Sequence, residues 1–464
     1  MANTAVTAFV AESLDETRLT GFHWRVIALI IAGLFFDLFD VAILGSLAPD
    51  FIAKHFATPS EVAVVASATF LGLLVGSIVQ GELTDRFGRK TVYQANLLVY
   101  GVATLLAAAS PNYIVLASLR FVAGLGLGAE IPLAYAYAAE FSPRRNRGRV
   151  MAVVNMVGGC LPFPLAILFA LTFRGVLGWQ GIFIVIGLAA LLVFVFRISL
   201  PESPRWLAAH GRNPEALAII RKMGIDPPPT LAAGPASTER MQMDPLAIVF
   251  RRYTRRVIAL MVALFAAFAA LYGLVTWLPT LMGTRGFDIT KSLTFVLVMT
   301  TAFPISSLIL TVLLDSIGRI KTAVGSFVLG GIFAILFMES SSNAAVLVNG
   351  FFMSLFTVNA ANTLEVLCGE LFPTRARSSG SGLGFGAGRL GAVLASYIVI
   401  VILNGAGVNG VFVAIAITLA VGAVSSLVLG QETAGLSLEE IASSEPEADS
   451  LPHPSAARSE SSPA

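Results

Sequence analysis

The chain has 464 residues, of which 56% are hydrophobic and 12% are charged, with a formal net charge of +2 at pH 7. Soluble domains usually contain roughly a quarter of charged residues, so this composition excludes an ordinary soluble enzyme. The near-neutral balance and the lack of a long basic block argue against a nucleic-acid partner. The apolar content is sufficient for about twelve bilayer-spanning helices of about 20 residues each.

Chain order divides the sequence into five parts. Residues 1–25 carry acids and no signal-peptide core, so we expect a cytosolic N-terminal segment followed by a first span that is retained. Apolar runs over 26–200 and again over 257–430 predict two six-helix bundles. Between them, 201–256 contains PPP and RRYTRR and predicts a cytosolic linker with short amphipathic helices. The polar tail over 431–464 is expected to be disordered.

The distribution of basic residues predicts the orientation. Of the 30 Lys and Arg residues, only four fall in loops predicted to lie outside: Lys54, Arg174, Arg285 and Lys291. This bias places both termini in the cytosol. We therefore expect a monomeric, multi-pass protein of the cell inner (plasma) membrane, with the lipid bilayer, protons and a small-molecule substrate as its partners.

The sequence predicts neither a metal site nor a cofactor. Its two cysteines, Cys160 and Cys368, lie in apolar runs and belong to no CxxC pair or Cys/His cluster. No nucleophile and histidine occur together in a span, so we do not expect an enzyme.

Two motifs recur at a separation of 230 residues. DRFGR at 85–89 is matched by DSIGR at 315–319, and EFSPRRNR at 140–147 is matched by ELFPTRAR at 370–377. Duplicated halves are a recurring plan of secondary transporters, with the substrate site at the interface of the repeats. The sequence therefore predicts an all-α membrane protein with twelve transmembrane helices in two pseudo-symmetric six-helix bundles.

Several segments carry a family resemblance. GELTDRFGRK at 81–90 resembles the signature loop of the major facilitator superfamily, and PESPRWL at 201–207 resembles the motif after the sixth helix of its sugar-porter and organic-ion branches. FDLFD at 36–40 is similar to the paired-acid first helix of aromatic-acid:proton symporters. RFVAGLGLGAEIPLAYAYAAEFSP at 120–143 and GRLGA at 388–392 are similar to niacin-type metabolite:proton symporters.

The resemblance covers about 26–430 and implies the major facilitator fold with alternating-access transport. It favours proton symport of a small organic anion, an aromatic or heteroaromatic monocarboxylate of the benzoate or nicotinate type. A sugar or organic-cation porter is the alternative within the superfamily, although the Gln pair typical of sugar recognition in the seventh helix is absent. A non-transporting membrane sensor is the remote alternative.

Buried charges found in only one half are candidates for transport, because shared polar residues serve the common scaffold. Asp37, Asp40, Arg120 and Glu130 face Ala or Gly at the matching positions of the second half, and Arg389 faces Gly in the first. Intramembrane charge persists only beside a cavity or a partner. Asp37 and Asp40 share one helix face and raise each other's proton affinity, as a proton carrier requires. Simple hydrogen bonding within the bundle is the structural alternative.

The resemblance implies that Asp40 pairs with Arg120 when deprotonated and releases it when protonated, whereas a permanent structural ion pair is the alternative. Arg389 lies about 15 Å along its span, near the bilayer centre. It is interpreted as a bidentate anchor for an organic anion, against the alternative of pairing with Glu365 or Glu130. Glu130 is interpreted as a second proton site or substrate partner, against a helix-packing acid.

The remaining candidates form two sets. Further substrate-binding residues, with packing as the alternative for the aromatic ones, are Glu365, Tyr135, Tyr272, Trp277 and Phe356. The shared motifs predict a cytosolic gate of weak ion pairs that holds the outward-facing state. Its members are Asp85, Arg86, Arg89, Glu140, Asp315, Arg319, Glu370 and Arg375.

Overall fold

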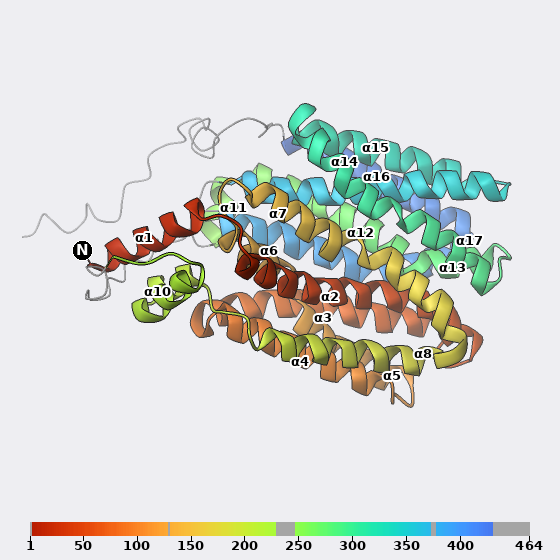
Figure 1. The fold of residues 1–464 in the computed structure, drawn as a ribbon. Helices are drawn as coiled ribbons and strands as arrows, with labels where there is room; N and C mark the ends of the chain where they lie inside the picture. Colours follow the sequence, from red (N-terminus) through yellow and green to blue (C-terminus); the bar gives the residue numbers. More distant parts are fainter. Residues whose placement is uncertain (1, 129, 229–245, 373–376, 430–464) are drawn as a thin grey trace, which may run out of the picture.

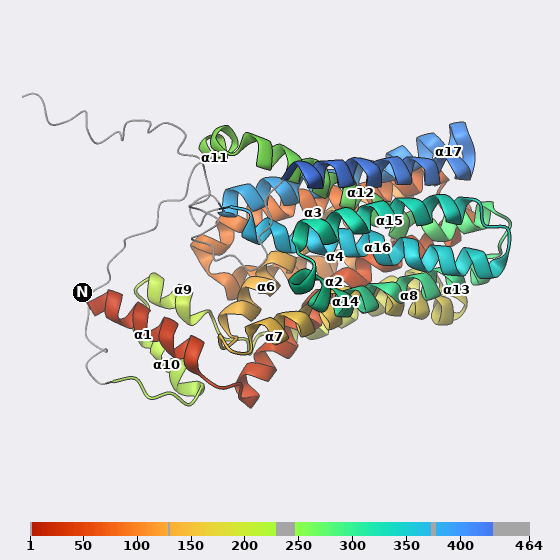
Figure 2. The same ribbon diagram turned by 90° about the horizontal axis from the view of Figure 1, so that it is seen from above.

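A computed structural model gives the fold and describes residues 2–128, 130–228, 246–372 and 377–429. This part of the chain is almost entirely helical and contains no strand. The long helices run side by side in one elongated bundle, and four short helices gather at one end of it (Figures 1 and 2). We call this the linker end and the opposite one the far end.

The helices follow in chain order. The first half contains α1 (Ala2–Glu16), α2 (Gly21–Ala53), α3 (Pro59–Phe87), α4 (Arg89–Ala107), α5 (Tyr113–Leu127), α6 (Glu130–Glu140), α7 (Arg147–Val153), the π-helix η1 (Val154–Cys160) and α8 (Pro162–Arg197). The linker contains α9 (Pro204–Ala209), α10 (Asn213–Lys222) and α11 (Leu246–Arg252). The second half contains α12 (Thr254–Thr284), α13 (Ile289–Thr300), α14 (Ala302–Ser316), α15 (Arg319–Met338), α16 (Asn343–Glu370) and α17 (Arg377–Leu429).

Within the described ranges, nine helical stretches are long and apolar enough to cross a membrane. Two of them, Arg147–Arg197 with 51 residues and Gly380–Leu429 with 50, exceed the length of one span. Each reverses at a left-handed glycine, Gly178 with φ 63° and Gly407 with φ 69°. The helix α4 adds a further 19 residues. The structure thus accommodates the twelve predicted spans, although only nine stretches meet the criterion as continuous helices.

The reversal at Gly178 leads to a stability prediction. Left-handed backbone costs an L-residue about 1–2 kcal/mol, and we expect Gly178→Ala to lower the free energy of unfolding by about that amount. The matched control is Gly175→Ala, because Gly175 lies in α8 with open space around its Cα. Unfolding of the purified variants in detergent gives the comparison. Equal stability of the two variants would contradict the assigned turn.

The duplicated motif has a duplicated geometry. Gly88 and Gly318, separated by 230 residues, have φ of 91° and 100°. Each precedes an arginine that begins the next helix, Arg89 in α4 and Arg319 in α15. A residue with a Cβ would be strained at either position. The repeat found in the sequence is therefore a repeated helix-glycine-helix turn.

The N-terminal helix α1 belongs to a cap at the linker end. It packs against α9 and α10, and Val6 and Val10 are fully buried there. Asp15, at the end of α1, forms ion pairs with Arg147 at 2.6 Å and Arg205 at 2.9 Å. The cap thereby attaches the start of the chain to the start of α7 and to α9. Residues 430–464, where disorder is predicted, lie outside the described part of the chain.

The two halves contact each other closely at the far end. Ser67 of α3 donates a hydrogen bond to the carbonyl of Val393 in α17 at 2.9 Å. Arg174 of α8 donates to Thr290 of α13, also at 2.9 Å. The backbone of α12 lies so near Gly45 of α2 that no side chain fits between them. The conformation is therefore closed at the far end.

Candidate functional site

A buried ion pair joins α5 to α2. The side chains of Arg120 and Asp40 are completely buried. Nη1 of Arg120 donates to Oδ1 of Asp40 at 3.1 Å, and Nη2 contacts Oδ2. This is the bidentate geometry of strong guanidinium–carboxylate pairs. Nη1 also lies 3.4 Å from the hydroxyl of Thr104.

Close packing of α5 on α3 explains why Arg120 is buried. Arg120, Gly124 and Gly128 are spaced by four residues and share one face. A side chain at Gly124 or at Gly128 would collide with the backbone of α3. Only glycine permits this approach, which seals the arginine into the bundle beside its acid.

A second buried pair joins α6 to α8 and was not predicted from the sequence. Nη2 of Arg197 donates to Oε1 of Glu130 at 2.7 Å, and the Arg197 side chain is 0% exposed. Its Nε donates to the carbonyl of Leu29 at 2.9 Å, and Nη2 donates to that of Ile30 at 3.2 Å. The guanidinium carbon lies 3.8 Å from the ring centre of Tyr93, a cation–π contact. The pair therefore fastens α2 from two sides.

Gly33 of α2 provides the space for this second pair. A side chain there would collide with the guanidinium of Arg197 and the carboxylate of Glu130. The sequence argument counted Arg197 with the basic linker, because it lies only four residues before Pro201. Its counterpart 230 residues later is Leu427. The comparison of halves that selected Glu130 would thus have selected Arg197 too.

Two buried charges of opposite sign have no partner in the described part of the chain. Asp37 of α2 is 2% exposed, and its Oδ1 lacks a hydrogen-bond partner there. Arg389 of α17 is 5% exposed and makes no ion pair or hydrogen bond there either. Each lies within electrostatic range of the other. An uncompensated buried charge costs several kcal/mol, so both groups are poised for a partner.

Two more predicted residues lie near Arg389. Glu365 of α16 and Tyr272 of α12 both interact with it electrostatically. Glu365 is half-buried rather than at an open rim. The ring of Tyr272 lies 4.9 Å from that of Phe70 in α3, at a contact between the halves. The structure thus brings Asp37, Arg389, Glu365 and Tyr272 into one region of the interface.

Tyr135 takes part in a bridge between the halves. Its hydroxyl donates to Oδ1 of Asn155 at 2.9 Å, and Nδ2 of Asn155 donates to Oγ of Ser307 at 3.1 Å. Asn155 lies in η1, and π-helical turns often mark functional sites. Sequence reasoning missed Asn155, although a polar amide in the first half opposite Phe385 in the second was a signal.

The two other predicted aromatic residues occupy packing positions. Trp277 of α12 is 0% exposed. Phe356 of α16 stacks on Phe333 and Phe352, with ring centres 5.8 and 6.2 Å away. These contacts match the packing role given above as the alternative.

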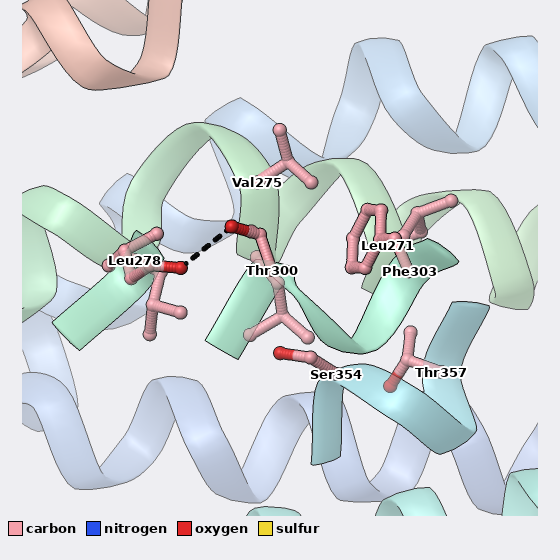
Figure 3. A pocket seen from close by; sticks show the side chains of 9 residues that line it. Leu271, Val275, Leu278, Thr300, Phe303, Ser354 and Thr357 are labelled. Carbon is pink, nitrogen blue, oxygen red and sulfur yellow. Dashed lines mark hydrogen bonds between the residues drawn. The ribbon is translucent and has the colours of Figure 1, made fainter. Parts of the chain in front are cut away.

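A small cavity lies inside the second half, between α12, α13, α14 and α16 (Figure 3). Its volume of about 10 Å³ is the room of about one water molecule. The hydroxyl of Thr300 donates to the carbonyl of Val296 at 2.9 Å, and that of Thr357 has no partner in the described part of the chain. The cavity is a packing gap and is too small for an organic substrate.

Two pairs of the predicted gate are formed at the linker end. Arg89 forms an ion pair with Glu140, and Nε of Arg319 lies 3.1 Å from Glu370. Each pair lies within one half. The carboxylate of Glu202 accepts from the backbone N–H of Arg89 at 3.1 Å. Outside the described residues lie the side chains of Asp85, Arg86 and Asp315 and the whole of Arg375.

No cluster of three or more His, Cys, Asp or Glu side chains suited to a metal ion occurs in the described ranges. Cys160 and Cys368 are both buried and form no disulfide. The buried carboxylates with a partner, Asp40 and Glu130, are instead paired with arginines.

Comparison with known proteins identifies the family. Residues 26–444 match the family model described as sugar (and other) transporter. The niacin transporter NiaP of Acinetobacter baylyi is 30% identical over 433 residues, which are 92% of this chain and 98% of that protein. The chain belongs to this transporter family.

Two further similarities place the transporter in a superfamily. The 4-hydroxybenzoate transporter PcaK of Acinetobacter baylyi is 28% identical over 84% of this chain and 87% of that protein. The solved structure of the major facilitator superfamily proton:xylose symporter XylE has a TM-score of 0.70 at 18% identity, over 91% of this chain and 98% of that chain. The transporter therefore has the major facilitator fold and is a multi-pass membrane protein, not an enzyme.

Proposed function

We propose that this transporter is a proton symporter of a small organic anion, an aromatic or heteroaromatic monocarboxylate. The observation that carries the proposal is Arg389, a buried guanidinium without a partner in the described chain, near the interface of the halves. Guanidinium binds carboxylate in a bidentate fork. The names of NiaP and PcaK state niacin and 4-hydroxybenzoate, and each of these compounds carries one carboxyl group on an aromatic ring.

Proton coupling is assigned to the pair of Asp40 and Arg120. While Asp40 is charged, its fork with Arg120 ties α2 to α5. Protonation of Asp40 removes the charge that holds the guanidinium, which keeps only the long contact to Thr104 at 3.4 Å. Proton binding would thereby loosen α2 and α5 and permit the change of state. A permanent structural pair is the alternative that the Discussion tests.

Asp37 gives the substrate site its own dependence on protons. A carboxylate bound to Arg389 would lie within electrostatic range of Asp37. Two like charges in a site of low dielectric constant disfavour each other, so the bound anion favours protonated Asp37. Glu130 is kept charged by Arg197 and acts on Asp37 in the same direction. Anion and proton would then travel together.

The linker end is proposed to face the cytosol, with both termini inside and the transporter in the inner membrane as a monomer. Support comes from the few Lys and Arg residues in the far-end loops. The far end would then be the outer face, closed in this conformation. The pairs of Arg89 with Glu140 and Arg319 with Glu370 would act as the cytosolic gate.

An organic cation is the second candidate substrate. Two acids near the interface, Asp37 and Glu365, make no ion pair with a described residue and could bind a positive charge. A cation would be repelled by Arg389, whereas an anion would be attracted to it. Variants of Arg389 therefore separate the two candidates.

We expect Arg389→Ala to weaken uptake of nicotinate or 4-hydroxybenzoate by at least about tenfold, because a hydrogen-bonded charge is lost. Arg389→Lys should restore little, since an ammonium lacks the planar fork. Uptake into proteoliposomes is measured for these anions and for a quaternary amine. Arg221→Ala, at an exposed site in α10, is the control. Normal anion uptake by Arg389→Ala would contradict the proposed substrate class.

A further inference from the structure

A groove runs along the outer surface of the second half, between α12 and the last part of α17. Its volume is about 610 Å³, in the range of pockets that bind small molecules. The lining is apolar apart from one arginine and one serine: Arg255, Ile258, Ala259, Val262, Ile417, Ala420, Val421, Val424, Ser425 and Val428.

The length of the groove matches one leaflet of a bilayer. On α17 the lining runs from Ile417 to Val428, which is about 16 Å at the helical rise. One leaflet contributes about 15 Å of hydrocarbon, half of a typical bilayer core. Val428 and Arg255 both lie at the linker end of their helices. The groove therefore extends from the membrane interface toward the bilayer centre.

Positive charge is concentrated at the interfacial end of the groove. Arg255 and Arg251 are exposed and form no ion pair with a residue that the structure describes. Phe250 beside them is 41% exposed, as suits a helix lying in the interface. The hydroxyl of Ser425 already donates to the carbonyl of Ala259 at 2.8 Å. An occupant therefore finds an apolar floor and binds its polar group only at the arginines.

We propose that this groove binds one anionic phospholipid, with an acyl chain between α12 and α17 and its phosphate on Arg251 and Arg255. A neutral lipid would fill the floor but leave the arginines without a net counter-charge. A soluble phosphate would meet the arginines but leave the floor empty. A phospholipid with net negative charge satisfies both features at the membrane interface.

The experiment uses the full-length protein in phosphatidylcholine nanodiscs with and without phosphatidylglycerol. Native mass spectrometry of the released protein counts the lipids that remain bound. We expect retention of phosphatidylglycerol over phosphatidylcholine, weakened about fivefold for each of Arg251→Gln and Arg255→Gln. Ala420→Phe, which fills the groove at an exposed position, should remove the bound lipid while the arginines stay in place.

Arg221→Gln is the matched control, because it removes an exposed arginine of α10 away from the groove. Circular dichroism confirms that each variant is helical before lipids are counted. Equal retention of the two lipids, or retention unchanged by the arginine variants, would overturn the proposal. Equal protection by soluble glycerol phosphate, or a cross-link between two copies across the groove, would overturn it as well.

Discussion

Replacing Arg120 by Leu is expected to abolish proton-coupled uptake and to lower the free energy of unfolding by about 3–5 kcal/mol. The loss follows because Asp40 would stay fully buried with its counter-charge removed. An unpaired carboxylate in this position must either remain charged at high cost or hold a proton permanently. Thermal unfolding in detergent and uptake into proteoliposomes measure the two effects.

The double variant Asp40→Asn with Arg120→Leu separates stability from transport. It removes both charges, so we expect most of the lost stability to return while pH-driven accumulation stays absent. Arg221→Leu, at an exposed site, should change neither property. Coupled uptake by the double variant would show that the pair serves the scaffold alone.

Arg197→Leu is expected to destabilise the transporter by a similar amount, about 3–5 kcal/mol, because Glu130 would lose its only ion pair in the described chain. It would also free the carbonyls of Leu29 and Ile30 from their donors. Combined replacement by Arg197→Leu and Glu130→Gln should recover part of the stability. The readout is again unfolding of the purified protein.

Gly33 offers an independent test of the same pair. Gly33→Val introduces a side chain where the Arg197 guanidinium lies, and we expect it to displace the pair and lower stability. Gly21→Val is the control in the same helix, because nothing surrounds a side chain at Gly21. If Gly33→Val is as stable as Gly21→Val, the arrangement of Arg197 beside Gly33 is incorrect.

The scaffold was predictable because it is written twice. The motifs containing Gly88 and Gly318 recur at one separation, and both glycines have the same left-handed conformation. The spans followed from apolar length, and the reversals at Gly178 and Gly407 were placed within a few residues by the loops between them. These features depend on local sequence, which periodicity and composition report directly.

The partners of the buried charges depend on tertiary packing and were less accessible. The pair of Asp40 and Arg120 was expected only through the family resemblance, since 80 residues separate the two. Glu130 was selected as a candidate, but its partner Arg197 looked like a loop residue because the span before it ends close by. The absence of an ion pair at Arg389 could not be deduced from sequence, because it depends on which side chains α16 and α2 turn toward it.

The most direct test of the account is the proton movement that accompanies substrate uptake. In proteoliposomes with a pH-sensitive dye inside and no imposed gradient, nicotinate or 4-hydroxybenzoate added outside should acidify the lumen with the wild-type protein. Asp40→Asn should exchange substrate across the membrane but produce no acidification. Uptake without proton movement by the wild type, or acidification that persists in Asp40→Asn, would contradict the central claim.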